Sequence, residues 1–502
     1  YTEAQARRIF TQMDRDPDSP TYGCFDRNYW HYKMRDFPSA ILQQAVFALV
    51  SQGRDEWAVA AIYALARQVR GSGAVDEYFP REDSYPAAAF GLWAAARVLC
   101  DWQAEGSRLL ARIEWDGLRR LARRLSRRVE VEAANQYAAG VAALALASRL
   151  DAFGEIAPSV ASHAGCLFAL QHPEGWFPEY GGPDFGYLTV TLDALADYEE
   201  TTGDPRAAQA ADHAIEFLAR LMGPDSQLPW TLNSRNTDYV VPYGLVRVAA
   251  RNPAAAWLVK TLFGGLGSPA HPLWAADDRY HLHYIYASAV RSLPHLSRMA
   301  PAEAPSWPRR LWLAGSGYFV VRSEDGRHAL YVAARKGGSI RLHSAARTPA
   351  RFDHGWRIRR GRRLWATDWW SDHWQVQPCE DGLAVEGPME DCRFHRGTPL
   401  RHIVLRALAW LLGRRLTTLL RRVLIFRRGQ ATGPMFRREV TVGETGFTIR
   451  DEIRVAPDAR VVPAPRQNLR HVASAGSFHP EELFAPLAGG RRMFEVRWTN
   501  LE

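Results

Sequence analysis

The residues best suited to chemistry lie in a Gly/Pro-rich loop at positions 178–187, which reads PEYGGPDFGY. This loop carries two acids and two tyrosines, and an apolar helical pattern takes over directly after it. Loops on a rigid scaffold are where binding and catalytic residues concentrate. We therefore predict a site that holds a sugar and moves a proton on it. Its first candidates are Glu179, Tyr180, Asp184 and Tyr187.

Three further polar clusters lie near predicted helices, and the one at 233–244 repeats the polar, aromatic and Gly/Pro composition of the loop. Asn135 and Gln136 stand among small residues, where Asn135 fits either a helix N-cap or a ligand for a substrate carboxylate. Two later clusters, at 233–244 and 278–284, add the candidates Arg235, Asn236, Tyr239, Tyr243 and His283. His281 and His283 lack the four-residue spacing that places two metal ligands on one helix face.

An aromatic and charged cluster at 24–33 offers a second kind of sugar contact. Trp30 can stack on a sugar face, while cationic side chains can pair with carboxylates. The alternative is an N-terminal arm packed on the domain. The candidates here are Arg27, Trp30, His31 and Lys33.

These residue types favour proton abstraction beside a carboxylate. No Ser/His/Asp or Cys/His nucleophile and no dinucleotide fingerprint is visible in the chain. The C5 hydrogen of a uronic acid is weakly acidic, so an enzyme must neutralise the carboxylate and place a Tyr or His base. Loss of the C4 substituent gives a lyase, and return of the proton from the other face gives a C5-epimerase. Glu179 and Asp184 would instead serve a glycoside hydrolase as an acid/base pair.

The elements that position these residues fall into two regions. Apolar residues at helical spacing predict helices at 39–51, 57–69, 87–102, 115–128, 132–150, 157–171, 187–201, 207–222 and 280–297. Their hairpins recur about every 50 residues and are expected to close into a ring. We predict an α+β multidomain chain, with an (α/α) toroid catalytic domain at 1–300 and a Pro-rich linker at 301–309.

The region at 310–502 reads as an antiparallel β-sandwich of two sheets. Short apolar and aromatic runs with intervening turns predict strands at 317–322, 329–334, 436–441, 447–453 and 494–498. The tryptophan-rich segment 365–374 fits either the sandwich core or a platform for glycan.

The charge balance narrows the class of partner. The 502 residues carry a formal charge of +9, and only three of the 63 basic residues are lysines (33, 260 and 336). Arginine grips carboxylates bidentately, so this surface suits an acidic polysaccharide or oligosaccharide. No nucleic-acid-binding motif appears, and we expect no nucleic-acid partner. The sequence does not indicate an oligomeric state.

The segment 401–428 is the most basic amphipathic stretch of the chain. It fits a packed helix with a solvated arginine face, or a helix in peripheral contact with an anionic membrane. The five cysteines are scattered, which favours a reducing compartment. No signal peptide is visible, so we expect a cytoplasmic rather than a periplasmic protein, although trimmed termini would hide an export signal.

Taken together, these features resemble the heparinase II/III-like polysaccharide lyase superfamily, in the subgroup found among genes for extracellular polysaccharide assembly. The resemblance rests on a helical toroid followed by a sandwich, and on the segments 135–136, 179–187, 234–239, 317–322 and 336–338. It implies that Asn135 neutralises the substrate carboxylate. The tyrosine that handles protons would be Tyr187, Tyr180 or Tyr239, and its histidine partner would be His283 or His343.

One departure bears on the sandwich. The superfamily usually carries His-Gly-His-x-Asp early in that domain, whereas this chain reads GSIRLH at 338–343 and DHGW at 353–356. A structural divalent metal there is therefore not supported by motif, and we predict no cofactor. The leading prediction is a lyase acting on a uronic-acid glycan. The alternatives are a uronate C5-epimerase of exopolysaccharide biosynthesis and a glycoside hydrolase.

Overall fold

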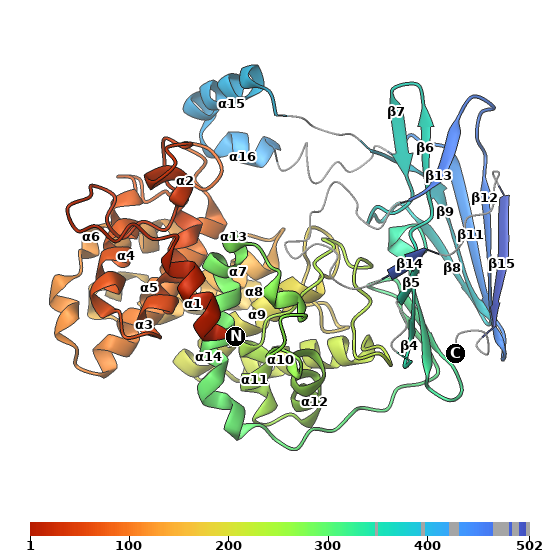
Figure 1. The fold of residues 1–502 in the computed structure, drawn as a ribbon, viewed down its shortest axis with the longest axis horizontal. Helices are drawn as coiled ribbons and strands as arrows, with labels where there is room; N and C mark the ends of the chain where they lie inside the picture. The colour runs from red at the N-terminus through yellow and green to blue at the C-terminus, as the bar shows by residue number, and fades with distance from the viewer. Residues whose placement is uncertain (347–349, 393–396, 421–430, 465–480, 484–490, 498–502) are drawn as a thin grey trace.

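The computed structural model describes residues 1–346, 350–392, 397–420, 431–464, 481–483 and 491–497. Helices occupy the chain as far as Arg298, and strands begin at Arg310. Figure 1 shows the helices gathered on one side of the molecule and the sheets stacked on the other. The chain thus consists of an N-terminal helical domain followed by C-terminal, largely antiparallel sheets.

Six helices form the inner layer of the helical domain, and each packs on the next. The last also packs against the first, which closes the ring. They are α3 (Val46–Val50), α5 (Tyr85–Ala104), α7 (Ala134–Ala147), α9 (Phe185–Thr202), α11 (Tyr243–Ala249) and α14 (Tyr286–Ser292). Helix α7 is buried on nearly every side, as its Ala-, Val- and Leu-rich sequence requires.

An outer layer of amphipathic helices covers this ring. It comprises α1 (Thr2–Phe10), α4 (Asp55–Gln68), α6 (Trp115–Leu125), α8 (Ala157–Phe168), α10 (Pro205–Arg220) and α12 (Pro253–Phe263). Helix α6 illustrates why these helices cover the ring with one face only. Its Leu118, Leu121 and Leu125 are buried, while arginines occupy its outer face. Shorter elements are α2 (Arg27–Trp30), η1 (Ala40–Ala45), η2 (Arg108–Arg112), η3 (Asp151–Ile156), η4 (Pro272–Trp274), α13 (Asp278–Tyr280), η5 (His281–Ile285), η6 (Leu293–Arg298) and η7 (Ala334–Lys336).

The predicted helix at 280–297 has a more irregular course than its apolar pattern indicates. The chain passes from α13 through η5, which is one turn of π-helix, into α14 and then into the 3-10 helix η6. A π-turn inserts an extra residue and redirects side chains, and such turns are common at functional sites. The sequence prediction also missed helices α1, α11 and α12 as elements.

Three sheets, rather than the two expected, follow the segment 299–309, which contains no helix or strand. The first orders β1 (Arg310–Leu313), β2 (Tyr318–Arg322), β3 (His328–Ala333), β4 (Ser339–Ser344), β5 (Ala350–Asp353) and β14 (Glu481–Leu483). The second orders β10 (Glu390–Asp391), β7 (Arg363–Ala366), β6 (Trp356–Arg360) and β13 (Arg460–Pro463). The third orders β15 (Arg491–Arg497), β12 (Gly446–Ile453), β11 (Met435–Val442), β9 (Gly382–Pro388) and β8 (Gln375–Cys379).

All strand pairs described are antiparallel except β5 with β14, which is parallel. The chain passes from the first sheet to the second between β5 and β6. Gly355 occupies that turn at φ 76°, a backbone conformation that side chains with a Cβ rarely adopt.

The first sheet is buried on both faces, and this fixes the sheets against the helices. Along β2, Tyr318 and Val320 join the core of the helical domain, whereas Phe319 and Val321 join the core of the sandwich. This division follows from the two-residue period of a strand. Loops from the sheets can therefore reach residues at one end of the helical ring.

The tryptophans at 365–374 belong to the interior. Trp365 and Trp374 lie in the sandwich core, and Trp369 and Trp370 are also buried. The ring of Trp370 meets Tyr318 edge-on at 6.0 Å between centroids. The alternative of a glycan platform is therefore wrong, because these rings have no face open to a ligand.

The predicted amphipathic stretch 401–428 forms two helices, α15 (Pro399–Leu412) and α16 (Arg414–Leu420), between β10 and β11. Gly413 at φ 51° separates them, and residues 421–428 lie outside the described residues. Both helices lie at the margin of the molecule (Figure 1). Among the described helices, none combines the length and the hydropathy needed to cross a bilayer.

Candidate functional site

A pocket of about 320 Å³ opens at one end of the helical ring. Pro86 of α5, Asn135 of α7 and Tyr187 of α9 line it, and each lies in the first turn of its helix. Helix N-termini carry partial positive charge and free N–H groups. Three inner helices thus direct their positive ends toward this pocket, which favours an anionic ligand.

Six residues predicted from the sequence come together in this pocket, from four separate segments of the chain. They are Asn135, Gln136, Tyr180, Tyr187, Arg235 and His283. The ring topology accounts for this grouping, because loops far apart in the sequence meet at the same end of the inner helices.

Asn135 is fixed by the buried carboxyl group of Glu179. The Asn135 backbone N–H donates to Glu179 Oε1 at 2.7 Å, and its Nδ2 donates to Oε2 at 2.7 Å. Ala133 is the N-cap of α7, so the alternative role of Asn135 as a cap is wrong. Burial raises the pKa of Glu179 to about 8, and the two hydrogen bonds from Asn135 oppose that rise. Glu179 lies behind the pocket wall, where it orients the Asn135 amide.

Asp184 also accepts hydrogen bonds from backbone N–H groups. It is the N-cap of α9, accepting from Tyr187 N at 3.0 Å, and its second oxygen accepts from Thr237 N at 3.3 Å. Burial raises its pKa to about 6. Because both Glu179 and Asp184 are buried and hold backbone amides, the geometry does not support them as the acid/base pair of a hydrolase.

These carboxyl groups give a prediction about stability and pH. The folded-state pKa values of Glu179 (about 8) and Asp184 (about 6) lie above their ordinary values of 4.5 and 3.8. Their contribution to stability is therefore complete at low pH and is lost as pH rises through the folded-state values. We expect the Tm of the protein to fall between pH 5 and 8, and Glu179→Gln to flatten that decline. Calorimetry across this range tests it.

The control for this experiment is Glu56→Gln. Glu56 is exposed on α4, where Arg112 lowers its pKa. Its replacement should leave the slope of Tm against pH unchanged. A Glu179→Gln protein with the wild-type slope would contradict the role of Glu179 as a buried, high-pKa group.

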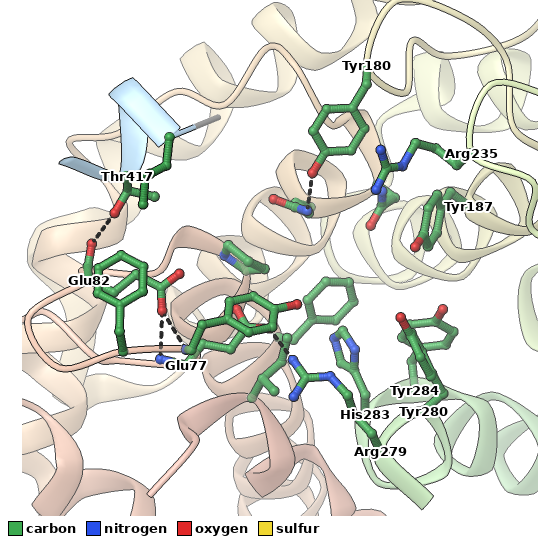
Figure 2. Close-up of a pocket in the computed structure, with 18 residues that line it drawn as sticks. Glu77, Glu82, Tyr180, Tyr187, Arg235, Arg279, Tyr280, His283, Tyr284 and Thr417 are labelled. Atoms are coloured by element: carbon green, nitrogen blue, oxygen red, sulfur yellow. Dashed lines mark hydrogen bonds and ion pairs between the residues drawn. The ribbon is translucent and has the colours of Figure 1, made fainter. Parts of the chain in front are cut away.

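Arg235 and Tyr180 form one side of the pocket (Figure 2). The Arg235 guanidinium lies 4.3 Å from the centroid of the Tyr180 ring. Its buried Nη1 has no hydrogen-bond partner within the described part of the chain. The Tyr180 hydroxyl accepts from Gln136 Nε2 at 3.3 Å. An unsatisfied guanidinium nitrogen beside amide groups is suited to a substrate carboxylate.

Lys336 of the sheet domain holds the loop that carries Arg235. Its buried Nζ donates to the carbonyl oxygens of Thr231 (2.5 Å) and Asn233 (2.9 Å) and to Asn236 Oδ1. Burial lowers the pKa of Lys336 to about 8. The predicted ligand Asn236 therefore faces this lysine and does not line the pocket.

Replacing Lys336 with methionine should loosen that loop. Three buried acceptors would lose their donor, and relief from burying the ammonium offsets part of the cost, leaving about 2 kcal/mol of lost stability. We expect a lower Tm and weaker substrate binding. Lys260→Met is the matched control, because Lys260 is exposed on the outer helix α12. Equal Tm and KM in the two variants would contradict this role.

His283 lies on the π-turn η5 and faces the pocket. The centroids of the His283 and Phe90 rings lie 4.3 Å apart in an edge-on arrangement. The buried Nε2 of His283 has no hydrogen-bond partner among the residues described. Burial, and then the charge of Arg279, holds the pKa of His283 well below 6.5. The imidazole is therefore neutral at physiological pH, with a nitrogen open to accept a proton.

Tyrosine hydroxyls surround the same space. Figure 2 shows Tyr187 across from Tyr280 and Tyr284, with His283 beside the latter pair. Burial, followed by the neighbouring tyrosines, raises the pKa of Tyr187 well above 10, and Arg235 opposes this shift. Tyr239 hydrogen-bonds the Tyr284 hydroxyl from behind and does not line the pocket. Tyr187 is thus protonated at neutral pH.

An acidic rim that was not predicted from the sequence lies opposite this group. Arg279 pairs with Glu77 and lies 4.9 Å from the Tyr78 ring centroid. Glu82 accepts from the backbone N–H groups of Glu77 and Tyr78, and burial raises its pKa to about 7. The segment 76–83 reads DEYFPRED ahead of a helix, the same mixture as 178–187, and that signal could have identified it.

The remaining predicted residues lie outside the pocket. Trp30 donates to Gln12 O at 2.8 Å, within a packed arm around α2. Tyr243 donates to Asp197 at 3.1 Å inside the ring, and His343 of β4 pairs at 2.7 Å with Asp225 of the helical domain. The predicted residues that do not line the pocket are Arg27, Trp30, His31, Lys33, Glu179, Asp184, Asn236, Tyr239, Tyr243 and His343.

The segment 353–356 lies in the region where the superfamily usually carries its metal motif. Its polar side chains contact other protein residues. Asp353 pairs with the buried Arg438 at 2.8 Å, and His354 contacts Thr231 at 3.1 Å. Within the described ranges, no group of three or more His, Cys, Asp or Glu residues is arranged to hold a metal ion.

The fold is that of polysaccharide lyases of known structure. The chain matches the chondroitin AC lyase of Streptomyces coelicolor A3, solved in complex with chondroitin sulphate, with a TM-score of 0.52 and 12% identity. That match covers 92% of this chain and 66% of the lyase, so the chain spans slightly less than two thirds of its length. No family model and no curated protein matches the sequence.

Two other lyases match with lower scores. Heparinase III gives a TM-score of 0.37 at 11% identity, covering 90% of this chain and 75% of that one. A heparan sulfate lyase from Pedobacter heparinus gives a TM-score of 0.39 at 10% identity. That match covers 90% of this chain and 68% of the lyase. At such identities the likeness shows the fold alone, and the function has to be argued from the pocket.

Proposed function

We propose that this protein is a polysaccharide lyase that cleaves a uronic-acid glycan by abstraction of the C5 proton and β-elimination. The observation that carries this proposal is a neutral His283 with an open Nε2, in one pocket with Arg235, Asn135 and the Tyr187 hydroxyl. The lyase fold makes a polysaccharide the expected substrate class.

Substrate binding begins with the carboxylate. The unpaired Nη1 of Arg235 is the donor to it, and the amides of Asn135 and Gln136 line the same pocket. The N-terminal ends of α5, α7 and α9 add positive potential. Spreading the carboxylate charge over these groups stabilises the carbanion-like transition state and makes the C5 hydrogen more acidic.

Proton transfer then uses the two groups across the pocket. His283 Nε2 takes the C5 proton, and the electron pair of the broken C5–H bond forms the C4=C5 double bond. The C4–O bond breaks, and its oxygen takes the proton of the Tyr187 hydroxyl. The raised pKa of Tyr187 keeps it protonated for this role, whereas the lowered pKa of His283 keeps it free to accept.

A uronate C5-epimerase is the second candidate. Hydroxyl groups reach the pocket from two directions, Tyr187 from α9 and Tyr280 and Tyr284 from the segment 278–285. A tyrosine on the face opposite His283 would be able to return a proton to C5. Deuterium entering C5 from heavy water without chain cleavage would identify this reaction.

The test is incubation of the purified protein with a panel of uronate polymers, chondroitin sulphate and heparan sulfate included. A lyase product contains a C4=C5 double bond conjugated to the carboxylate, so ultraviolet absorbance should rise with time. Cleavage without that absorbance, or no reaction with any uronate polymer, would count against the proposal.

A further inference from the structure

Helix α15 exposes its apolar side chains to solvent, which is unusual for a helix in a folded domain. Of its fourteen residues only Ala409 is buried. Leu400, Trp410 and Leu411 are 70%, 64% and 69% exposed, and Ile403 is 65% exposed. Contiguous apolar surface of this kind marks a contact with something outside the monomer.

The helix is nevertheless in contact with the helical domain. Arg406 donates to both carboxylate oxygens of Asp36, at 2.6 and 2.9 Å. Leu416 of α16 packs with Phe79, and the Thr417 hydroxyl donates to Glu82 O at 3.0 Å. The apolar face of α15 is therefore presented outward from a fixed position.

The helices themselves carry charge of one sign, and Asp36 of the neighbouring segment pairs with one of their arginines, Arg406. Residues 399–420 contain four arginines and no acid, and Arg401, Arg414 and Arg415 are exposed. The segment that bears Asp36 adds exposed Tyr32, Lys33 and Met34 beside the helix. We call the exposed side chains of α15 together with residues 32–34 the outer patch.

We propose that the outer patch docks on an anionic bilayer surface, with α15 lying in the plane of the interface. Leucine, isoleucine and tryptophan side chains would enter the headgroup region, while the arginines would pair with acidic lipid headgroups. Fourteen helical residues are too few to span the bilayer, which takes about 20.

Charge and composition favour this occupant over two others. A two-fold contact between copies of this chain would set the same arginines against each other with no acid in the helix to balance them. A nucleic acid would leave the exposed leucines without an apolar partner. The inference does not depend on the proposed function, but α16 contributes Thr417 and Leu420 to the pocket wall, so docking would hold the pocket beside the lipid surface.

The test is flotation of the full chain with vesicles of phosphatidylcholine containing about 30% phosphatidylglycerol, compared with pure phosphatidylcholine. We expect binding to the anionic vesicles, at least tenfold weaker binding to the neutral ones, and loss of most binding in about 0.5 M salt. The triple variant Leu400→Ser/Ile403→Ser/Leu411→Ser should lose binding at least tenfold, because its apolar contacts are removed.

The matched control is Val129→Ser/Val131→Ser/Leu296→Ser, which removes exposed apolar side chains elsewhere on the surface. It should bind like the wild type, and both variants should keep the wild-type Tm and activity on soluble glycan. Three results would overturn the proposal: no binding by the wild type, equal binding by the α15 variant, or a concentration-dependent dimer that the α15 variant abolishes.

Discussion

Replacing His283 with alanine is expected to lower kcat for elimination by about 10²–10⁴-fold, the usual contribution of a general base. The physical reason is the open Nε2 of a neutral imidazole in a buried setting. KM should change little, because the donors to the carboxylate stay in place. Steady-state kinetics on the best uronate polymer measures both constants.

Comparison with a second variant, Tyr187→Phe, distinguishes the catalytic base from the catalytic acid. Tyr187→Phe should also be severe with a natural glycan, but a substrate with a better leaving group at C4 needs no protonation and should restore much of its rate. The same substrate should not restore His283→Ala. Tyr137→Phe is the control, since Tyr137 is a buried tyrosine that bonds His163 outside the pocket. A His283→Ala enzyme within tenfold of wild type would contradict the assignment of His283 as the base.

Replacing Arg235 with glutamine is expected to lower kcat/KM by about 10²–10³-fold, comparable to the loss of one preorganised donor at a developing charge. Its unpaired Nη1 is the strongest cationic donor available to the substrate carboxylate. Arg235→Lys should recover only part of the loss, because a lysine cannot reproduce the planar fork of donors. The rates follow from the same kinetic measurement.

A chemical change in the substrate sharpens this prediction. A methyl ester has no carboxylate charge to neutralise, so Arg235→Gln should lose much less activity on methyl-esterified uronate than on the free acid. Arg251→Gln is the control, since this arginine lies on the outer surface near Glu199 and Asp212. Equal losses on the ester and on the acid would contradict a carboxylate role for Arg235.

Much of the fold could be predicted from the sequence because each part has a local signal. The continuous apolar runs of β2 and β3 and the apolar periodicity of α5, α7 and α9 are visible without tertiary information. The split of 280–297 around a π-turn was not predictable in the same way. Apolar spacing is the same for a straight helix and for one whose backbone takes on an extra residue.

The site could be predicted only where side-chain type was sufficient. The loop 178–187 supplies Tyr180 and Tyr187 to the pocket, but its two carboxyl groups hold backbone amides of α7 and α9 instead. Whether an acid caps a helix or faces a ligand depends on partners far away in the chain. The pair of Arg279 with Glu77 shows the same limit, since 202 residues separate them.

The central claim is that this pocket performs an elimination, and product analysis in oxygen-18-labelled water tests it most directly. We predict that mass spectrometry of the cleaved uronate glycan will show an unsaturated uronic acid at the new non-reducing end. No labelled oxygen should enter either product, and His283→Ala should form both products about 10²–10⁴-fold more slowly. Saturated products that carry the heavy oxygen would show hydrolysis and would contradict the account.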